Sequence, residues 1–169
     1  DYYALAPAWT RDGAPRQVLL LGLGGGTGAH VYRQLFPEAA VTGVELDPMM
    51  VRAGVEQLHL RLDGVMVVVG DARVFAAAQA QKPGVRYDVV IVDAFQFPYV
   101  PFQLTTQEFF TTLSACLAPG GVLVVNAGRY QDHREVVFAI ARTLATVFPH
   151  VRAVDPPNPS NTILVATHH

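Results

Sequence analysis

The order in which short apolar runs and amphipathic segments follow each other is the feature that most limits the fold of this chain. Apolar runs of strand length lie at residues 18–21, 40–44, 65–69, 89–92, 122–125, 151–154 and 163–166. Segments with helical spacing lie between them, at about residues 27–36, 48–59, 72–80, 106–117 and 133–148. Alternating strands and helices form βαβ units, and continuous apolar strands are typical of a sheet that is buried on both faces. The pattern therefore predicts an α/β fold: a doubly wound, Rossmann-like, mostly parallel seven-stranded sheet in an α/β/α sandwich.

Several of the expected helices have start signals. Asp47 precedes a proline, which predicts an N-cap followed by a first turn of preset geometry. Two pairs, Thr105 with Glu108 and Asp132 with Glu135, have the spacing of a capping box. The apolar stripe of the last helix, which should cover one face of the sheet, consists of Val136, Ile140, Leu144 and Val147.

Composition narrows the classes of protein to which the chain can belong. With 169 residues and 51% hydrophobic residues, it suffices for one domain with one core. The net charge is −2 and the basic residues are scattered, so no nucleic-acid partner is expected. No apolar run approaches the roughly 20 residues needed to cross a bilayer. The single Cys116 excludes an internal disulfide and is expected to be a small core residue.

The boundaries of the domain follow from the same pattern. The chain begins with Asp1 and has neither a starting Met nor a charged and then apolar leader. We therefore expect residues 1–16 to be a lead-in left from a longer protein. Residues 17–167 are the expected domain, and its expected location is cytoplasmic.

A glycine-rich turn follows the first expected strand. Residues 18–28 read VLLLGLGGGTG, which predicts a buried strand, a loop with five glycines and the start of a helix. Without Cβ atoms, backbone N–H groups and the helix N-terminus can approach a ligand closely. The next strand ends in Glu45, about 20 residues on, where a carboxylate can accept hydrogen bonds from both ribose hydroxyls. The alternative is a turn needed only for packing, with a solvated Glu45. Strand, loop and acid occur in the order that nucleoside binding requires, which favours a nucleoside site.

Two more acids stand at the ends of later strands. Asp71 follows the third apolar run and Asp93 follows the fourth. In an open parallel sheet, ligands bind outside the carboxyl ends of the strands, near the point where the strand order reverses. These acids should therefore converge with Glu45 on one edge. Each has an alternative role, because Asp71 can cap the following helix and Asp93 can be a loop acid.

These segments together resemble the spermidine synthase family within the class I methyltransferase-like fold. The motifs that carry the resemblance lie at residues 24–28 (GGGTG), 44–48 (VELDP), 70–72 (GDA), 87–93 (YDVVIVD) and 119–125 (PGGVLVV). Residues 101–110 and 161–167 are similar to the spermidine-synthase-like domains that bacteria often fuse to membrane-spanning segments. The resemblance covers about residues 17–167, and it implies a membrane domain elsewhere in the full-length protein.

The resemblance implies a site for decarboxylated S-adenosylmethionine or for S-adenosylmethionine itself, without a metal. Methylthioadenosine or S-adenosylhomocysteine would be the product. The positions implied in cofactor binding are Gly22, Gly24, Gly25, Gly26, Thr27, Glu45, Leu46, Asp71, Ala72 and Asp93. Within this set, Glu45 would hold the ribose, Asp71 with Ala72 would read the adenine amino edge, and Asp93 would face the reacting amine. Asp93 is also the implied catalytic residue, which helps to remove a proton from the amine. Gln96 and Tyr99 are the implied substrate-binding residues.

The sequence departs from the family at two positions that bear on the chemistry. The family places aspartates where this chain has Thr27 and Gln96. These carboxylates engage cationic amino groups, and losing each one removes a contact of about 1.5–3 kcal/mol. A neutral Thr27 also no longer repels the carboxylate of intact S-adenosylmethionine. Three functions thus stay open: an aminopropyltransferase acting on a small amine, a methyltransferase, and a nucleoside-binding domain without catalysis.

The amine side of the site is less well defined by the sequence. Spermidine synthases usually have a small β-domain before this fold, which we do not expect in this chain, and the resemblance implies that Tyr2 or Tyr3 corresponds to a family tyrosine near the amine. The aromatic residues after the fourth strand either pack in the core or form an acceptor pocket, and they are Phe95, Phe97, Tyr99 and Phe102. Exposed aromatics and the missing β-domain also predict self-association, as a homodimer. The terminal pair at residues 168–169 is interpreted as a tag remnant or frayed tail.

Overall fold

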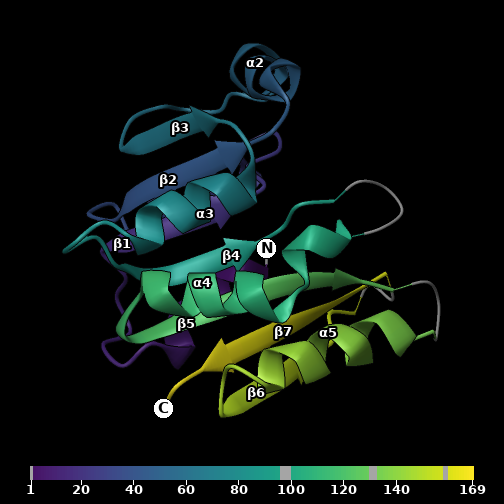
Figure 1. Cartoon of the computed structure of the whole chain (residues 1–169). Helices are drawn as coiled ribbons and strands as arrows, with labels where there is room; N and C mark the ends of the chain where they lie inside the picture. The colour runs from purple at the N-terminus through teal and green to yellow at the C-terminus, as the bar shows by residue number, and fades with distance from the viewer. Residues whose placement is uncertain (1, 96–99, 130–132, 158–159) are drawn as a thin grey trace.

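The computed structural model describes residues 2–95, 100–129, 133–157 and 160–169 (Figure 1). The strands are β1 (Gln17–Leu21), β2 (Ala40–Glu45), β3 (Val65–Val69), β4 (Tyr87–Val92), β5 (Leu117–Gly128), β6 (His150–Val154) and β7 (Asn161–Thr167). They form one seven-stranded sheet in the order β3-β2-β1-β4-β5-β7-β6. Strands β1 to β5 are parallel, and β7 runs antiparallel to both of its neighbours. The predicted fold class is confirmed, and the strand order reverses between β1 and β4.

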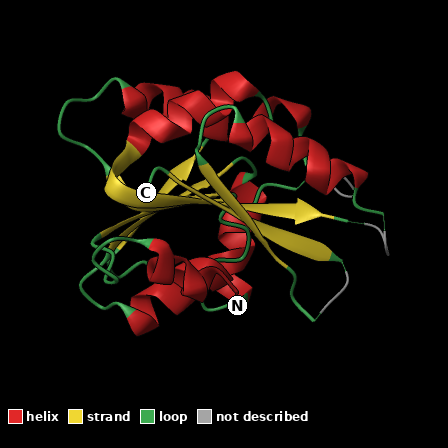
Figure 2. Cartoon of the chain, turned by 90° about the horizontal axis from the view of Figure 1, so that it is seen from below, coloured by secondary structure: helices red, strands yellow, loops and turns green. Residues whose placement is uncertain are grey.

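Helices cover both faces of this sheet (Figure 2). They are the 3₁₀ helices η1 (Tyr2–Trp9) and η2 (Phe102–Leu104) and the α-helices α1 (Thr27–Leu35), α2 (Pro48–Gln57), α3 (Ala72–Ala80), α4 (Gln107–Cys116) and α5 (Glu135–Ala145). Leu19 and Leu21 of β1 pack with side chains of α3, α4 and α5, whereas Val18 and Leu20 pack with η1 and α1. Each such side chain contributes about 1.5–3 kcal/mol when fully buried. Two-sided burial is the reason that the strands read as continuous apolar runs. Cys116 is buried in the first of these clusters, as predicted.

The helix starts agree only in part with the sequence signals. Asp47 caps α2 as predicted, because its side chain accepts a hydrogen bond of 2.8 Å from the Met49 N–H. For α4 the prediction was wrong by one residue. Thr106 is the N-cap and accepts from the Phe109 N–H at 3.2 Å. The Thr105 hydroxyl instead donates to a carbonyl of η2, which ends immediately before it.

The start of α5 also differs from the prediction. Its N-cap is Arg134, whose side chain makes no capping bond, and Asp132 lies outside the described residues. The buried stripe of the helix consists of Val137, Ile140 and Leu144, and Val136 is exposed. A shift of one residue rotates a side chain by about 100° around a helix, which is enough to exchange the two valines.

The N-terminal helix η1 belongs to the packed structure. Tyr3 and Ala6 are buried in the same cluster as α1 and one face of the sheet. The Tyr32 hydroxyl of α1 donates a hydrogen bond of 2.7 Å to the Tyr3 carbonyl. This contact fixes η1 near the carboxyl ends of the central strands. Within the described ranges, no helix has the length and apolar character needed to cross a membrane.

Candidate active site

The turn that follows β1 brings the ends of β1 and β4 into close contact. Gly22 has a φ of +95°, a conformation that side chains with a Cβ rarely adopt. A Cβ added at Gly22 would lie 2.3 Å from the carbonyl oxygen of Asp93. The Gly22 N–H donates to the Val44 carbonyl at 2.9 Å, and the Asp93 N–H donates to the Leu21 carbonyl at 2.8 Å. Glycine at position 22 therefore lets Asp93 lie directly beside the turn.

The other glycines of the turn have two different surroundings. A Cβ on Gly25 would lie 2.4 Å from a methyl carbon of Leu58, and a Cβ on Gly26 would lie 2.3 Å from one of Leu60. A Cβ on Gly24 would have no protein atom within 4 Å. Gly25 and Gly26 thus pack against leucine side chains of the segment that follows α2. Gly24 has open space at the position of a Cβ.

Glu45 lies half-buried at the end of β2, and its side chain hydrogen-bonds the backbone of this turn. Its Oε2 accepts a hydrogen bond of 2.8 Å from the Gly24 N–H, and its Oε1 accepts one of 3.1 Å from the Asp47 N–H. Beside it, Leu46 is 69% exposed and offers an apolar surface. Thr27, the first residue of α1, is exposed. The carboxylate is thereby held in one orientation at the carboxyl edge of the sheet.

Asp71 has the capping role that the sequence left open. Its Oδ1 accepts hydrogen bonds from the N–H groups of Arg73 and Val74, at 2.8 and 2.9 Å. Ala72 is the first residue of α3. No donor in the described part of the chain bonds the second oxygen, Oδ2. One carboxylate oxygen therefore orients α3 while the other faces away from these amides.

Asp93 is half-buried and hydrogen-bonded to groups from two other elements. The Asn126 side-chain N–H of β5 donates to Asp93 Oδ1 at 2.8 Å, and the Tyr3 hydroxyl of η1 also bonds the carboxylate. Burial raises the pKa of Asp93, and the hydrogen bonds from Asn126 and Tyr3 offset part of this rise. Burial, and then the nearby Asp93 charge, raise the pKa of Tyr3, so its hydroxyl stays neutral. A half-buried carboxylate with a raised pKa is suited to exchange a proton with a ligand.

Asn126 is a residue of this site that sequence reasoning missed. The signal was present, because Asn126 is the polar residue that ends the apolar run of β5. A buried amide at the carboxyl end of a central strand needs a polar partner. Asp93 at the end of the neighbouring strand is that partner.

The anchor of η1 allows a first prediction. Tyr32→Phe should destabilise the fold by about 1–3 kcal/mol, because it removes the hydrogen bond of the buried Tyr32 hydroxyl to the Tyr3 carbonyl. Amide hydrogen exchange in residues 2–9 should accelerate. Tyr87→Phe is a matched control, since Tyr87 is also buried but bonds Thr42. Unchanged exchange in η1 of Tyr32→Phe would show that the tyrosine does not hold it.

Several expected features lie at the border of the site or outside it. Gln96 and Tyr99, and Phe97 with them, lie outside the described residues. Phe102 is 81% exposed, and Phe95 lies against Gly128 at the end of β5. Among the described residues there is no group of three or more His, Cys, Asp or Glu that could hold a metal. His168 is exposed but makes side-chain contacts, because its ring centroid lies 4.7 Å from that of Phe148 and its Nε2 lies 2.7 Å from Ser114 Oγ.

Residues 7–161 match the family model described as the spermine/spermidine synthase domain. The chain belongs to this family. A relative from Bifidobacterium longum, described as a probable polyamine aminopropyl transferase, is 37% identical over 98% of this chain and 37% of its own length. The structure resembles a probable spermidine synthase from Corynebacterium glutamicum, with a TM-score of 0.78 and 31% identity over 90% of this chain and 56% of that one. The chain thus spans well under two thirds of either relative.

The class I methyltransferase fold is shared with more distant proteins. Human methyltransferase-like protein 13, solved in complex with S-adenosylhomocysteine, has a TM-score of 0.83 and is 24% identical over 99% of this chain and 78% of that one. At this identity the likeness concerns the fold alone.

Proposed function

We propose that this domain transfers an aminopropyl group from decarboxylated S-adenosylmethionine to a small amine, with Asp93 as the catalytic residue. The observation that carries the proposal is the position of Asp93. Its carboxylate is half-buried and has a raised pKa, and its backbone carbonyl lies against Gly22 of the glycine turn. A proton acceptor next to a nucleoside-type turn is what transfer to an amine requires.

The residues present fit the nucleoside part of the donor. Glu45 is oriented by two backbone amides, and each of its oxygens keeps a lone pair with which it can accept from a ribose hydroxyl. Gly24 leaves room for close approach to its backbone, and Leu46 offers an apolar surface to a base. Asp71 Oδ2 and the start of α3 can meet the adenine amino edge. Bound there, the donor supplies a sulfonium leaving group.

The proposed reaction combines one proton transfer to Asp93 with transfer of the aminopropyl group. Asp93 accepts the proton of the acceptor amine, so that a neutral nitrogen forms the new bond to the aminopropyl carbon. The carbon–sulfur bond breaks at the same time, and its electron pair stays on sulfur in methylthioadenosine. Asp93 then passes the proton to solvent. Positioning of the two reactants supplies the remainder of the acceleration.

Methyl transfer from intact S-adenosylmethionine is the second candidate. One observation favours it: the first residue of α1 is the neutral, exposed Thr27. A threonine there neither attracts the ammonium group of the decarboxylated donor nor repels a carboxylate. A comparison of the binding of the two donors bears on this choice: tighter binding of the decarboxylated form favours aminopropyl transfer, and tighter binding of the intact form favours methyl transfer.

The nucleoside site is tested by calorimetry with methylthioadenosine. Glu45→Ala should weaken binding at least about tenfold, or about 1.4 kcal/mol, because it removes the ribose acceptor and releases the Gly24 N–H. Glu38→Ala, an exposed acid in the preceding loop, should bind like wild type. Affinity equal to wild type in Glu45→Ala would refute the assignment of the site.

A further inference from the structure

A second asparagine stands behind the pair formed by Asn126 and Asp93. The Asn161 side-chain N–H, at the start of β7, donates a hydrogen bond of 2.7 Å to Asn126 Oδ1. The amide nitrogen of Asn126 in turn donates to Asp93 Oδ1 at 2.8 Å. Asn126 is only 8% exposed, so solvent cannot easily replace either partner. The three side chains form a directed relay from β7 through β5 to the end of β4.

The direction of the relay has a chemical consequence. A side-chain amide has one acceptor end and one donor end. If a donor holds the oxygen of Asn126, its NH₂ group must point the other way, toward Asp93. Without that donor the amide can turn round and present its oxygen to the carboxylate. Two oxygens that face each other are compatible only with a protonated Asp93.

We infer that Asn161 is a positioning residue of this site, which acts through Asn126 to keep Asp93 ionised and aimed at the acceptor amine. The inference rests on the proposed function for its catalytic meaning. The effect of Asn161 on the Asp93 carboxyl does not depend on that function, and it can be measured in the folded domain without a substrate.

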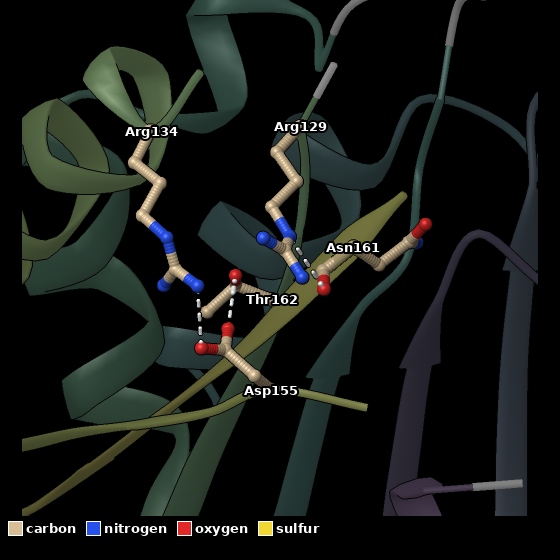
Figure 3. Close-up of polar contacts among 5 residues, drawn as sticks. All are labelled: Arg129, Arg134, Asp155, Asn161 and Thr162. Carbon is tan, nitrogen blue, oxygen red and sulfur yellow. Dashed lines mark hydrogen bonds and ion pairs between the residues drawn. The ribbon is translucent and has the colours of Figure 1, made fainter. Parts of the chain in front are cut away.

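The surroundings of Asn161 support this role because they fix its backbone (Figure 3). The Arg129 Nε donates to the Asn161 carbonyl at 3.3 Å. The neighbouring Thr162 hydroxyl donates to Asp155 Oδ1 at 2.7 Å, and Asp155 Oδ2 pairs with Arg134 Nη2 at 2.7 Å. The first two residues of β7 are thus held by hydrogen bonds, Asn161 by Arg129 and Thr162 by Asp155. An amide on such a backbone can hold a partner in one orientation at low entropic cost.

The charged groups near Asp93 do not provide another explanation for its orientation. From η1 the titratable group is Tyr3, which hydrogen-bonds both Asp93 and the Asn126 side chain and stays neutral because its pKa is raised. Arg129 donates to the Asn161 carbonyl, Asp155 accepts from the Thr162 hydroxyl, and Arg134 pairs with Asp155. Arg134 lowers the pKa of Asp155, so this ion pair persists while Asp93 titrates. Within the described part of the chain, Asn126 is therefore the group through which β5 and β7 act on the carboxylate.

The test is the titration midpoint of the Asp93 carboxyl, followed by ¹³C NMR in the ligand-free protein and identified with Asp93→Asn. Asn126→Leu and Asn161→Leu should each raise the midpoint by about one pH unit, because the ionised form loses a hydrogen bond. The double variant should titrate like Asn126→Leu alone, since Asn161 acts through Asn126. An unchanged midpoint in Asn161→Leu, or an effect that adds to that of Asn126→Leu, would overturn the relay.

Two further variants keep the test decisive. Asn161→Asp is similar in size but accepts rather than donates, so it should turn the Asn126 amide round and raise the midpoint as well. Thr167→Val changes another buried polar residue of β7 at its far end and should leave the midpoint unchanged. Where turnover is measurable, the acid limb of the kcat/KM profile should move to higher pH by the same amount. A relay seen by NMR in a protein without turnover would refute the proposed function and leave this inference standing.

Discussion

Asp93→Asn is expected to reduce aminopropyl transfer by about 10²–10⁴-fold and to leave methylthioadenosine binding nearly unchanged. Asparagine keeps the shape of the side chain and can still bond Asn126 and Tyr3, but it cannot accept the proton of the amine. In the wild type, activity should fall as the pH falls through the raised pKa of Asp93, because only the ionised carboxylate is a base.

The same substitution should affect stability in the opposite direction. Because the pKa of Asp93 is raised in the folded state, the free energy of unfolding falls as the pH rises from the ordinary carboxyl pKa to the raised one, and it stays lowered above that. Asp93→Asn should therefore raise the Tm at neutral pH, which thermal unfolding measures. Asp88→Asn, on the same strand, is the control. Asp88 Oδ2 accepts from the N–H groups of Arg16 and Gln17, so its loss should lower the Tm. Full turnover in Asp93→Asn would exclude the proposed catalytic role.

Gly22→Ala is expected to destabilise the fold by about 2–5 kcal/mol, from about 1–2 kcal/mol of backbone strain at positive φ and about 1–3 kcal/mol of overpacking. The new methyl group would lie 2.3 Å from the backbone carbonyl oxygen of Asp93, where no side-chain rotation can relieve the contact. The strand ends would separate, and nucleoside binding should be lost together with stability. Denaturant unfolding and calorimetry measure the two effects.

Gly13→Ala is the matched control for that experiment. Gly13 also has a positive φ, of +70°, but a Cβ there would meet no atom within 4 Å. It should show the backbone strain alone, about 1–2 kcal/mol, with unchanged nucleoside binding. Equal losses in the two variants would mean that the contact between Gly22 and Asp93 does not hold the site together.

The fold could be predicted because its determinants are local. Strands buried on both faces must be continuous apolar runs, and the helices between them carry their own periodicity. The acids of the site could be placed for a related reason, because Glu45 ends a parallel strand and Asp71 and Asp93 follow the ends of two others. Their place at the carboxyl edge of the sheet follows from topology alone.

The remaining features depend on contacts between residues far apart in sequence. Asn126 and Asn161 are 35 residues apart and meet only because β7 returns antiparallel beside β5. Likewise, the division of the glycine turn into packing positions and the open Gly24 depends on Leu58 and Leu60. The cap of α4 was missed because Thr105 and Thr106 are chemically alike, and η2 engages the first of them.

The central claim is tested most directly by the product formed. The domain is incubated with a small aliphatic diamine and decarboxylated S-adenosylmethionine, and in parallel with intact S-adenosylmethionine. We predict that the incubation with the decarboxylated donor yields methylthioadenosine and an equal amount of aminopropylated amine. The incubation with the intact donor should yield neither product. Formation of S-adenosylhomocysteine from the intact donor, without methylthioadenosine from the other, would contradict the account and establish methyl transfer instead.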